Sequence, residues 1–176
     1  MSLTLSHVVL PTYTKGLATL THILNAAADY AKANGLDADA EFVGARLVPD
    51  MLPLSFQVQN ATNTVRRTLA RLQGQEDQPW ADGETTIAQL LERVEKAREL
   101  VKGADAAVID AKAGEEVDLP FGPKITIRLT SQASALDQGI PNFFFHLQTA
   151  YAILRSKGVP IGKRDFIGNF ITLPQQ

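Results

Sequence analysis

Apolar residues spaced three and four positions apart recur in four long segments of this chain, and this spacing constrains its fold most. In an α-helix it places apolar side chains on one face, which must be buried against another element. The pattern predicts helices over four ranges: about Pro11–Asn34, Pro49–Gln73, Glu84–Lys102 and Pro141–Lys157. Four such helices predict an all-α bundle.

Glycine and proline mark the expected ends of these helices. Gly35 and Gly74 follow the first two segments, where a left-handed glycine commonly ends a helix, and Gly158 ends the last one. Pro11 stands either in the first turn of its helix or at a kink after a short lead-in over residues 3–10. Pro53 has to lie in a first turn, because an interior proline would break the second helix.

Strand periodicity occurs only in the long crossover before the last helix. After a short helix expected over Ala104–Ile109, apolar and polar residues alternate along Ile125–Leu129. Pro120, Gly122 and Pro123 separate this stretch from Val117–Leu119. We therefore expect a small hairpin, which has to pack on the bundle because two strands are marginally stable alone.

The composition predicts one soluble domain over residues 1–176. The chain has 176 residues, is 45% apolar and carries a formal net charge of −2. This charge argues against a broad basic surface, so we expect neither a nucleic-acid nor a membrane partner. There is no cysteine, no basic signal-peptide start and no apolar run long enough to cross a bilayer, so a cytoplasmic location is expected.

Charge is unevenly distributed along the chain. Twelve acidic residues face five basic ones between Glu76 and Asp118, whereas six basic residues face two acidic ones from Leu119 onward. Solvated helix faces explain this pattern most simply. An attraction between an acidic and a basic patch, within the molecule or between subunits, is the alternative.

Three conspicuous features of the sequence are explained by structure without a functional role. The segment from Gly158 to Gly162 is one residue too short for a phosphate-binding loop, and Arg164 stands where that loop needs Ser or Thr. Lys163 and Arg164 are therefore expected to hold Asp165 or helix-end carbonyls, or to face solvent. The single tryptophan, Trp80, is expected to close one end of the core, and His22 to lie on an exposed polar face.

The last predicted helix carries the candidate site. With Leu147 at the centre of its apolar arc, His146 falls at the edge of the arc and Asn142 just beyond it. The two residues are four positions apart. They therefore lie on the same side of the helix, at the border of the core.

Three phrases of the sequence resemble one superfamily: ARLVPDMLPL, ARLQG and FFFHLQTAYAILRSKGVPIGKRDFIG. They are similar to the DinB/YfiT-like four-helix bundles, in a branch known only as a domain of unknown function. The resemblance implies an up-down-down-up bundle, frequent homodimers, and in active relatives a divalent metal held by three histidines. One of these comes from the start of the second helix and two, four residues apart, from the last. Some such relatives are metal-dependent thiol transferases or hydrolase-like enzymes.

Only part of that histidine set has a counterpart here. His146 matches one ligand of the last helix, but Asn142 occupies the second position, and Gln57 or Asp50 would have to replace the histidine of the second helix. One imidazole with amide oxygens binds zinc or nickel far more weakly than three imidazoles. We therefore expect a degenerate site without a metal cofactor; the alternative is a rearranged centre for a divalent metal such as zinc or nickel.

Three functions remain open on the sequence alone. The first is a homodimeric bundle, non-catalytic or with a degenerate metal site, that binds a small molecule in an interhelical pocket near His146. Its expected lining is Asp50, Gln57, Asn142, His146 and Tyr151. The second is a metal-dependent enzyme of the thiol-transferase or hydrolase type with His146 as a ligand. In the third, His146 only donates a hydrogen bond at the edge of the core and the protein acts through its surface.

Overall fold

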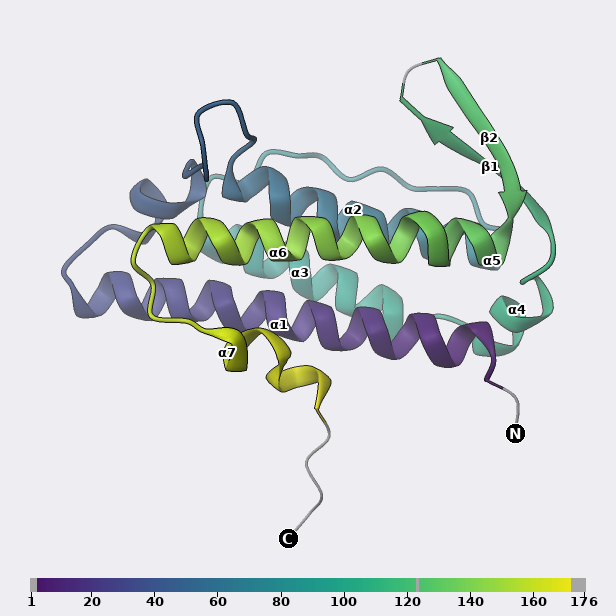
Figure 1. Cartoon of the computed structure of the whole chain (residues 1–176), viewed down its shortest axis with the longest axis horizontal. Coiled ribbons are helices and arrows are strands. Elements are labelled where there is room, and N and C mark those ends of the chain that lie inside the picture. Colours follow the sequence, from purple (N-terminus) through teal and green to yellow (C-terminus); the bar gives the residue numbers. More distant parts are fainter. Residues whose placement is uncertain (1–2, 123, 172–176) are drawn as a thin grey trace, which may run out of the picture.

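Four long helices form the body of the protein in the computed structural model, which describes residues 3–122 and 124–171 (Figure 1). They are α1 (Leu5–Ala33), α2 (Leu54–Gln73), α3 (Ile87–Lys102) and α6 (Ile140–Ser156). Both α1 and α2 pack against α3 and against α6. The apolar stripes of all four helices meet in one core, which confirms the predicted helical bundle.

Shorter elements connect and flank these helices. They are the π-helical turns η1 (Asp39–Val43) and η2 (Ser134–Gly139), the helices α4 (Ala106–Ala111), α5 (Ser131–Ala133) and α7 (Lys163–Ile167), the 3-10 turn η3 (Gly168–Phe170), and the strands β1 (Glu116–Phe121) and β2 (Ile125–Thr130). The strands form the predicted hairpin before the last long helix. They are antiparallel, with Glu116 opposite Thr130. Pro123, expected in its turn, lies outside the described residues. The hairpin projects from the end of the bundle where α6 begins (Figure 1).

Helix α1 begins six residues earlier than Pro11, at Leu5, so Pro11 lies inside the helix. Leu5 and Val9 are buried and extend the apolar stripe toward the N-terminus. The side chain of Asp110 also accepts hydrogen bonds from the backbone N–H and the hydroxyl of Ser6, both at 2.8 Å. The first bond holds the pKa of Asp110 below its usual value. A cap from α4, 104 residues away, therefore sets this helix start.

Helix α2 begins at Leu54, later than the predicted start near Pro49, and Pro53 is its cap residue. The loop that precedes α2 is not helical from Ala45 to Pro53. Within this loop, the Arg46 guanidinium donates a hydrogen bond to the backbone carbonyl of Met51. For α3, the hydroxyl of Thr86 accepts from the backbone N–H of Gln89 at 3.1 Å, as a capping residue should.

Two glycines determine how closely α1 packs on α6 and where α2 ends. A Cβ atom on Gly16 of α1 would lie 2.3 Å from Cε1 of the buried Phe143, so the absence of a side chain lets α1 and α6 pack closely. Gly74 ends α2 with a φ of 64°, a left-handed conformation that suits glycine.

No helix in the described part of the chain combines the length and apolarity that a membrane span requires.

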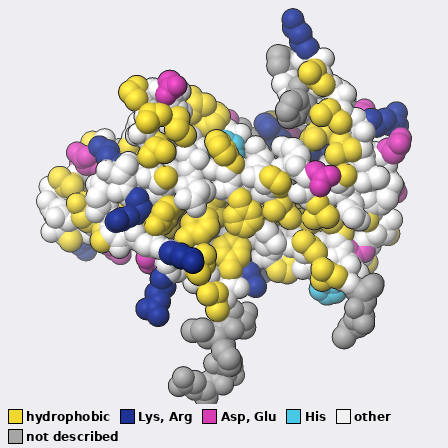
Figure 2. All heavy atoms as spheres, in the orientation of Figure 1, with side chains coloured by type: hydrophobic (Ala, Val, Ile, Leu, Met, Phe, Trp, Pro, Cys, Tyr) yellow, Lys and Arg dark blue, Asp and Glu magenta, His cyan; other side chains and the backbone are white. Residues whose placement is uncertain are grey.

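The C-terminal segment lies across α1. The carboxylate of Asp165 accepts from the backbone N–H of Gly162 at 2.8 Å and bonds to the His22 imidazole at 2.9 Å. The contact with His22 is the main cause of the lowered pKa of Asp165. Lys163 and Arg164 are exposed and so face solvent. Phe170 of this segment packs against Phe144, and Phe166 packs against Tyr151. Figure 2 shows hydrophobic side chains gathered in the middle of the face that is turned to the viewer.

Candidate functional site

His146 is a residue of α6, and its side chain, which is 8% exposed, faces Gln57 of α2. Its Nδ1 is 2.8 Å from Oε1 of the buried Gln57, whose Nε2 donates to the carbonyl of Leu52. With the amide oriented in this way, the imidazole Nδ1–H is the donor. Burial lowers the pKa of His146 to about 4, so the ring is neutral near pH 7. The histidine therefore links two helices through a neutral hydrogen bond.

The other predicted site residues do not surround His146. The side-chain amide of Asn142 donates to the hydroxyl of Thr64 at 2.7 Å, two helical turns along α2 from Gln57. Tyr151 packs edge-on against Phe166, with ring centroids 5.6 Å apart. Asp50 is exposed in the loop before α2. Of the five predicted residues, the structure thus brings together His146 and Gln57.

The donor set does not fit a divalent metal. Across residues 3–122 and 124–171, no three His, Cys, Asp or Glu side chains gather in a way that could hold an ion. At the positions the resemblance points to, Gln57 is engaged with the imidazole and with Leu52, and Asn142 with Thr64. An isolated neutral imidazole is a weak zinc or nickel site.

A pocket of about 520 Å³ lies at the Asn142 end of α6. Its walls come from α2, the loop that follows α2, strand β1, the π-helical turn η2 and the first turn of α6. The lining residues are Thr64, Arg67, Ala70, Arg71, Gln75, Asp77, Asp118, Leu119, Pro120, Gln138 and Asn142. Its volume falls within the usual range for small-molecule sites.

Two polar groups of this pocket lack partners. Among the described residues, Nε of Arg71 and Oε1 of Gln138 are buried without a hydrogen bond. The hydroxyls of Tyr13 and Thr68 are buried beside each other, outside the pocket lining, and both lie near Gly139, where an added Cβ would meet them at 2.8 and 2.6 Å. Burial raises the pKa of Tyr13 to about 12, so the phenol is protonated. Buried polar groups are usually hydrogen-bonded, so this region has unused capacity for a ligand.

Sequence reasoning missed Arg71 and Gln138. Arg71 lies in the last turn of α2, where a basic residue is already explained by the helix dipole. Gln138 lies in a segment without clear periodicity, which forms a π-helical turn. Such turns often occur at functional sites, but no residue pattern in this segment indicates one.

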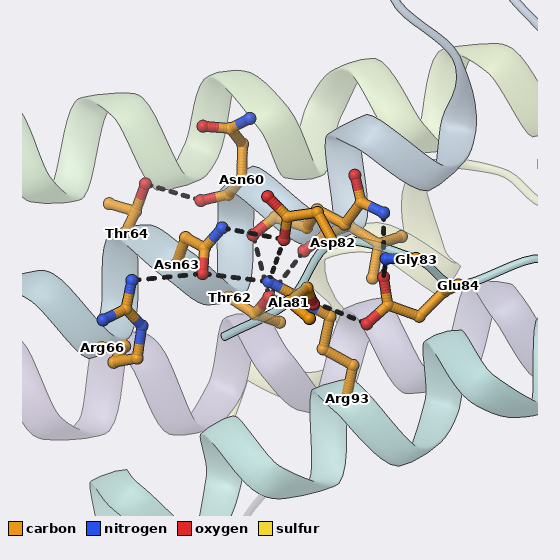
Figure 3. Close-up of polar contacts among 12 residues, drawn as sticks. Asn60, Thr62, Asn63, Thr64, Arg66, Ala81, Asp82, Gly83, Glu84 and Arg93 are labelled. Carbon is orange, nitrogen blue, oxygen red and sulfur yellow. Dashed lines mark hydrogen bonds and ion pairs between the residues drawn. The ribbon is translucent and has the colours of Figure 1, made fainter. Parts of the chain in front are cut away.

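A second polar cluster, centred on Arg93, is fully paired (Figure 3). Arg93 is buried, and its guanidinium makes five hydrogen bonds. The acceptors are the side chains of Thr62, Asn63, Asp82 and Glu84 and the backbone carbonyl of Ala81. The cluster ties the loop between α2 and α3 to both helices.

Trp80 belongs to the same loop and is partly buried against the core. The side-chain ammonium of Lys96 lies 4.4 Å from the centre of its ring, and the guanidinium groups of Arg93 and Arg66 lie 5.4 and 5.7 Å away. Arg66 in turn pairs with Asp77. A shallow hollow of about 430 Å³ borders Trp80, but its arginine is already saturated by protein acceptors. The pocket at Asn142 is therefore the better candidate.

Comparison with known proteins finds similarity over nearly the whole chain. The model of a family described as "Domain of unknown function (DUF1993)" matches residues 5–167. The crystal structure of a DinB family member protein from Shewanella denitrificans is 32% identical, with a TM-score of 0.85. The match covers 98% of this chain and 94% of that one. No curated protein matches the sequence.

Proposed function

The chain belongs to the DUF1993 family of DinB-like bundles, and from that premise we propose that it is a non-catalytic protein that binds a small molecule in an interhelical pocket. The pocket of about 520 Å³ at the start of α6 carries the proposal. It lies at the Asn142 end of this helix, one turn before His146, rather than around the imidazole itself.

Three features of this pocket support ligand binding. Its walls belong to different parts of the chain, so a ligand would contact α2, β1 and α6 together. The hydrogen bond between Asn142 and Thr64 fixes two of these walls relative to each other. Unpartnered polar groups on Arg71 and Gln138 can contribute hydrogen bonds that the protein itself leaves unmade.

A non-catalytic role agrees with the chemistry of the lining residues. Histidine is absent from the lining, and its acidic side chains are Asp77, which pairs with Arg66, and the exposed Asp118. The neutral His146 is occupied by Gln57. The described donors offer no specific support for the metal-dependent enzyme as a second candidate.

Fragment titration followed by NMR tests this function. The side-chain amides of Gln75, Gln138 and Asn142 line the pocket and give their own proton–nitrogen signals. We expect benzoate and benzamide, two small aromatic probes, to shift these signals in a saturable manner. The side-chain amides of Gln59 and Gln89, which lie at the Arg93 cluster and the start of α3, serve as internal controls.

A pocket-filling variant sharpens the test. Ala70→Phe places a large side chain in the lining, so it should abolish the saturable shifts. Ala88→Phe on the exposed face of α3 is the matched control and should leave them unchanged. The proposal is wrong if neither probe shifts the pocket amides, or if both still do so in Ala70→Phe.

A further inference from the structure

Arg71 differs from the buried arginines Arg66 and Arg93 in having no ion pair with a carboxylate among the described residues. Arg66 pairs with Asp77, and Arg93 pairs with Asp82 and Glu84. Arg71 is half-buried in the pocket wall, and its Nε makes no described hydrogen bond. Burial lowers the pKa of Arg71, and Asp77, which makes its ion pair with Arg66, offsets this effect only in part. The pocket thus contains a cation that an anionic ligand would stabilise.

The charges around the pocket favour a ligand with a single negative charge. Arg67 and Arg71 contribute two positive charges to the lining and Asp118 one negative charge, while Asp77 of the lining is neutralised by Arg66, which lies outside it. The difference is one positive charge. A monoanion neutralises this excess, whereas a dianion such as a phosphate monoester would leave one negative charge in a partly desolvated space.

Other lining residues indicate an organic rather than an inorganic anion. Leu119 is 4% exposed, and together with Ala70 and Pro120 it gives the pocket an apolar wall. A guanidinium presents two parallel N–H donors that match the two oxygens of a carboxylate. One wall can therefore pack on a hydrocarbon body while Arg71 binds its acid group.

We propose that the pocket selects an organic monocarboxylate, whose carboxylate is held by Arg71 and whose apolar part lies against Leu119 and Pro120. This inference rests on the proposed function, because it names the ligand class of the same pocket. Gln138 lies in the same lining and is available to a hydrogen-bonding group on the ligand.

Benzoate and benzamide separate charge from shape, because they have nearly the same outline and only benzoate is charged at pH 7. We expect benzoate to bind the full-length protein at least tenfold more tightly than benzamide in NMR titrations. Arg71→Gln should remove this preference, and Arg71→Lys should retain part of it, because lysine keeps the charge but loses the paired donors. Arg98→Gln, on the exposed part of α3, is the control and should keep the full preference.

A second variant tests the charge balance without altering the bundle. Asp118 is exposed on β1, so Asp118→Asn should preserve the fold while making the pocket more positive. Benzoate should then bind two- to threefold more tightly, with benzamide unchanged. Phenyl phosphate, which is largely dianionic above pH 7, should bind wild-type protein more weakly than benzoate.

The outcomes distinguish this inference from the proposed function. Equal affinities of benzoate and benzamide, both mapped to the pocket amides, would overturn the carboxylate specificity and leave small-molecule binding intact. A benzoate preference that persists in Arg71→Gln would overturn the role of Arg71. Absence of pocket shifts with both probes would overturn the proposed function and the inference together.

Discussion

His146 shows how far a single residue can be placed from the sequence. The helical period put it at the edge of the buried arc, and it is indeed buried at that border. Its partner could not be predicted in the same way, because Gln57 lies 89 residues away and the contact depends on the register between α2 and α6. The hydrogen bond of the third sequence hypothesis is present, whereas the ligand-binding role of His146 remains a prediction.

The lowered pKa of His146 predicts a loss of stability in mild acid. An ordinary histidine has a pKa of 6.5, and that of His146 is about 4 in the folded protein. Between these values the unfolded chain binds the proton more readily, so this group contributes most stability above pH 6.5 and loses it as pH falls toward 4. We expect a loss of about 2 kcal/mol in unfolding free energy from pH 7 to pH 5.

Urea unfolding across this pH range measures that slope. His146→Gln cannot titrate, so it should lack this part of the loss, whereas His7→Gln at an exposed position should retain it. An identical slope in wild type and His146→Gln would show that the imidazole titrates equally in the folded and unfolded states.

At the scale of elements, the helices were predicted well and their starts less well. Apolar spacing located the four long helices because burying one face is a local requirement that the sequence carries. The starts of α1 and α2 depend on contacts with distant residues or on the loop before them. Asp110 caps α1 from α4, and the loop of Arg46 and Met51 delays α2. No local pattern specifies these contacts.

The contact between α1 and α6 at Gly16 gives a prediction at this scale. Gly16→Ala would place a methyl group 2.3 Å from the ring of Phe143, so the two helices must separate or the ring must move. Overpacking of this kind costs about 1–3 kcal/mol of unfolding free energy. The cost should appear as a lower urea midpoint.

Gly44→Ala provides the matched control. A Cβ there meets no atom within 4 Å, and the backbone φ of −88° suits alanine. This variant should be neutral or stabilised by up to about 0.5 kcal/mol through the unfolded state. Equal urea midpoints for Gly16→Ala and wild type would mean that the contact between α1 and α6 accommodates the added methyl group without loss of stability.

At the scale of the whole molecule, the bundle and its hairpin could be predicted, but the pocket could not. The pocket exists only where β1, η2, α2 and α6 come together, and its two most informative residues lie in unrelated parts of the sequence. Arg71 was sufficiently explained by the helix dipole, and Gln138 carried no pattern. The homodimer, which the family resemblance implies, stays a prediction.

The Arg93 cluster predicts a global effect, because it joins α2, α3 and the long loop between them. Arg93→Met would leave Asp82 and the mostly buried Glu84 without their guanidinium. Breaking a buried ion pair by removing one partner is strongly destabilising, so we expect a loss of about 3 kcal/mol in unfolding free energy.

Arg98→Met is the control for this experiment. Arg98 is exposed and pairs with the exposed Glu95, so its loss should cost less than about 0.5 kcal/mol. Chemical denaturation of the two variants gives the comparison. A similar midpoint for both would show that the loop is held without Arg93.

The position of Trp80 determines what the intrinsic fluorescence of this protein can report. It is the single tryptophan of the chain, and Lys96, Arg93 and Arg66 lie around its ring. Its emission should therefore follow detachment of the loop during denaturation. Because Arg66 pairs with Asp77 of the pocket wall, a spectral change on adding benzoate would mean that this carboxylate has moved. An unchanged emission spectrum would mean that the ligand binds without disturbing the ion pair between Arg66 and Asp77.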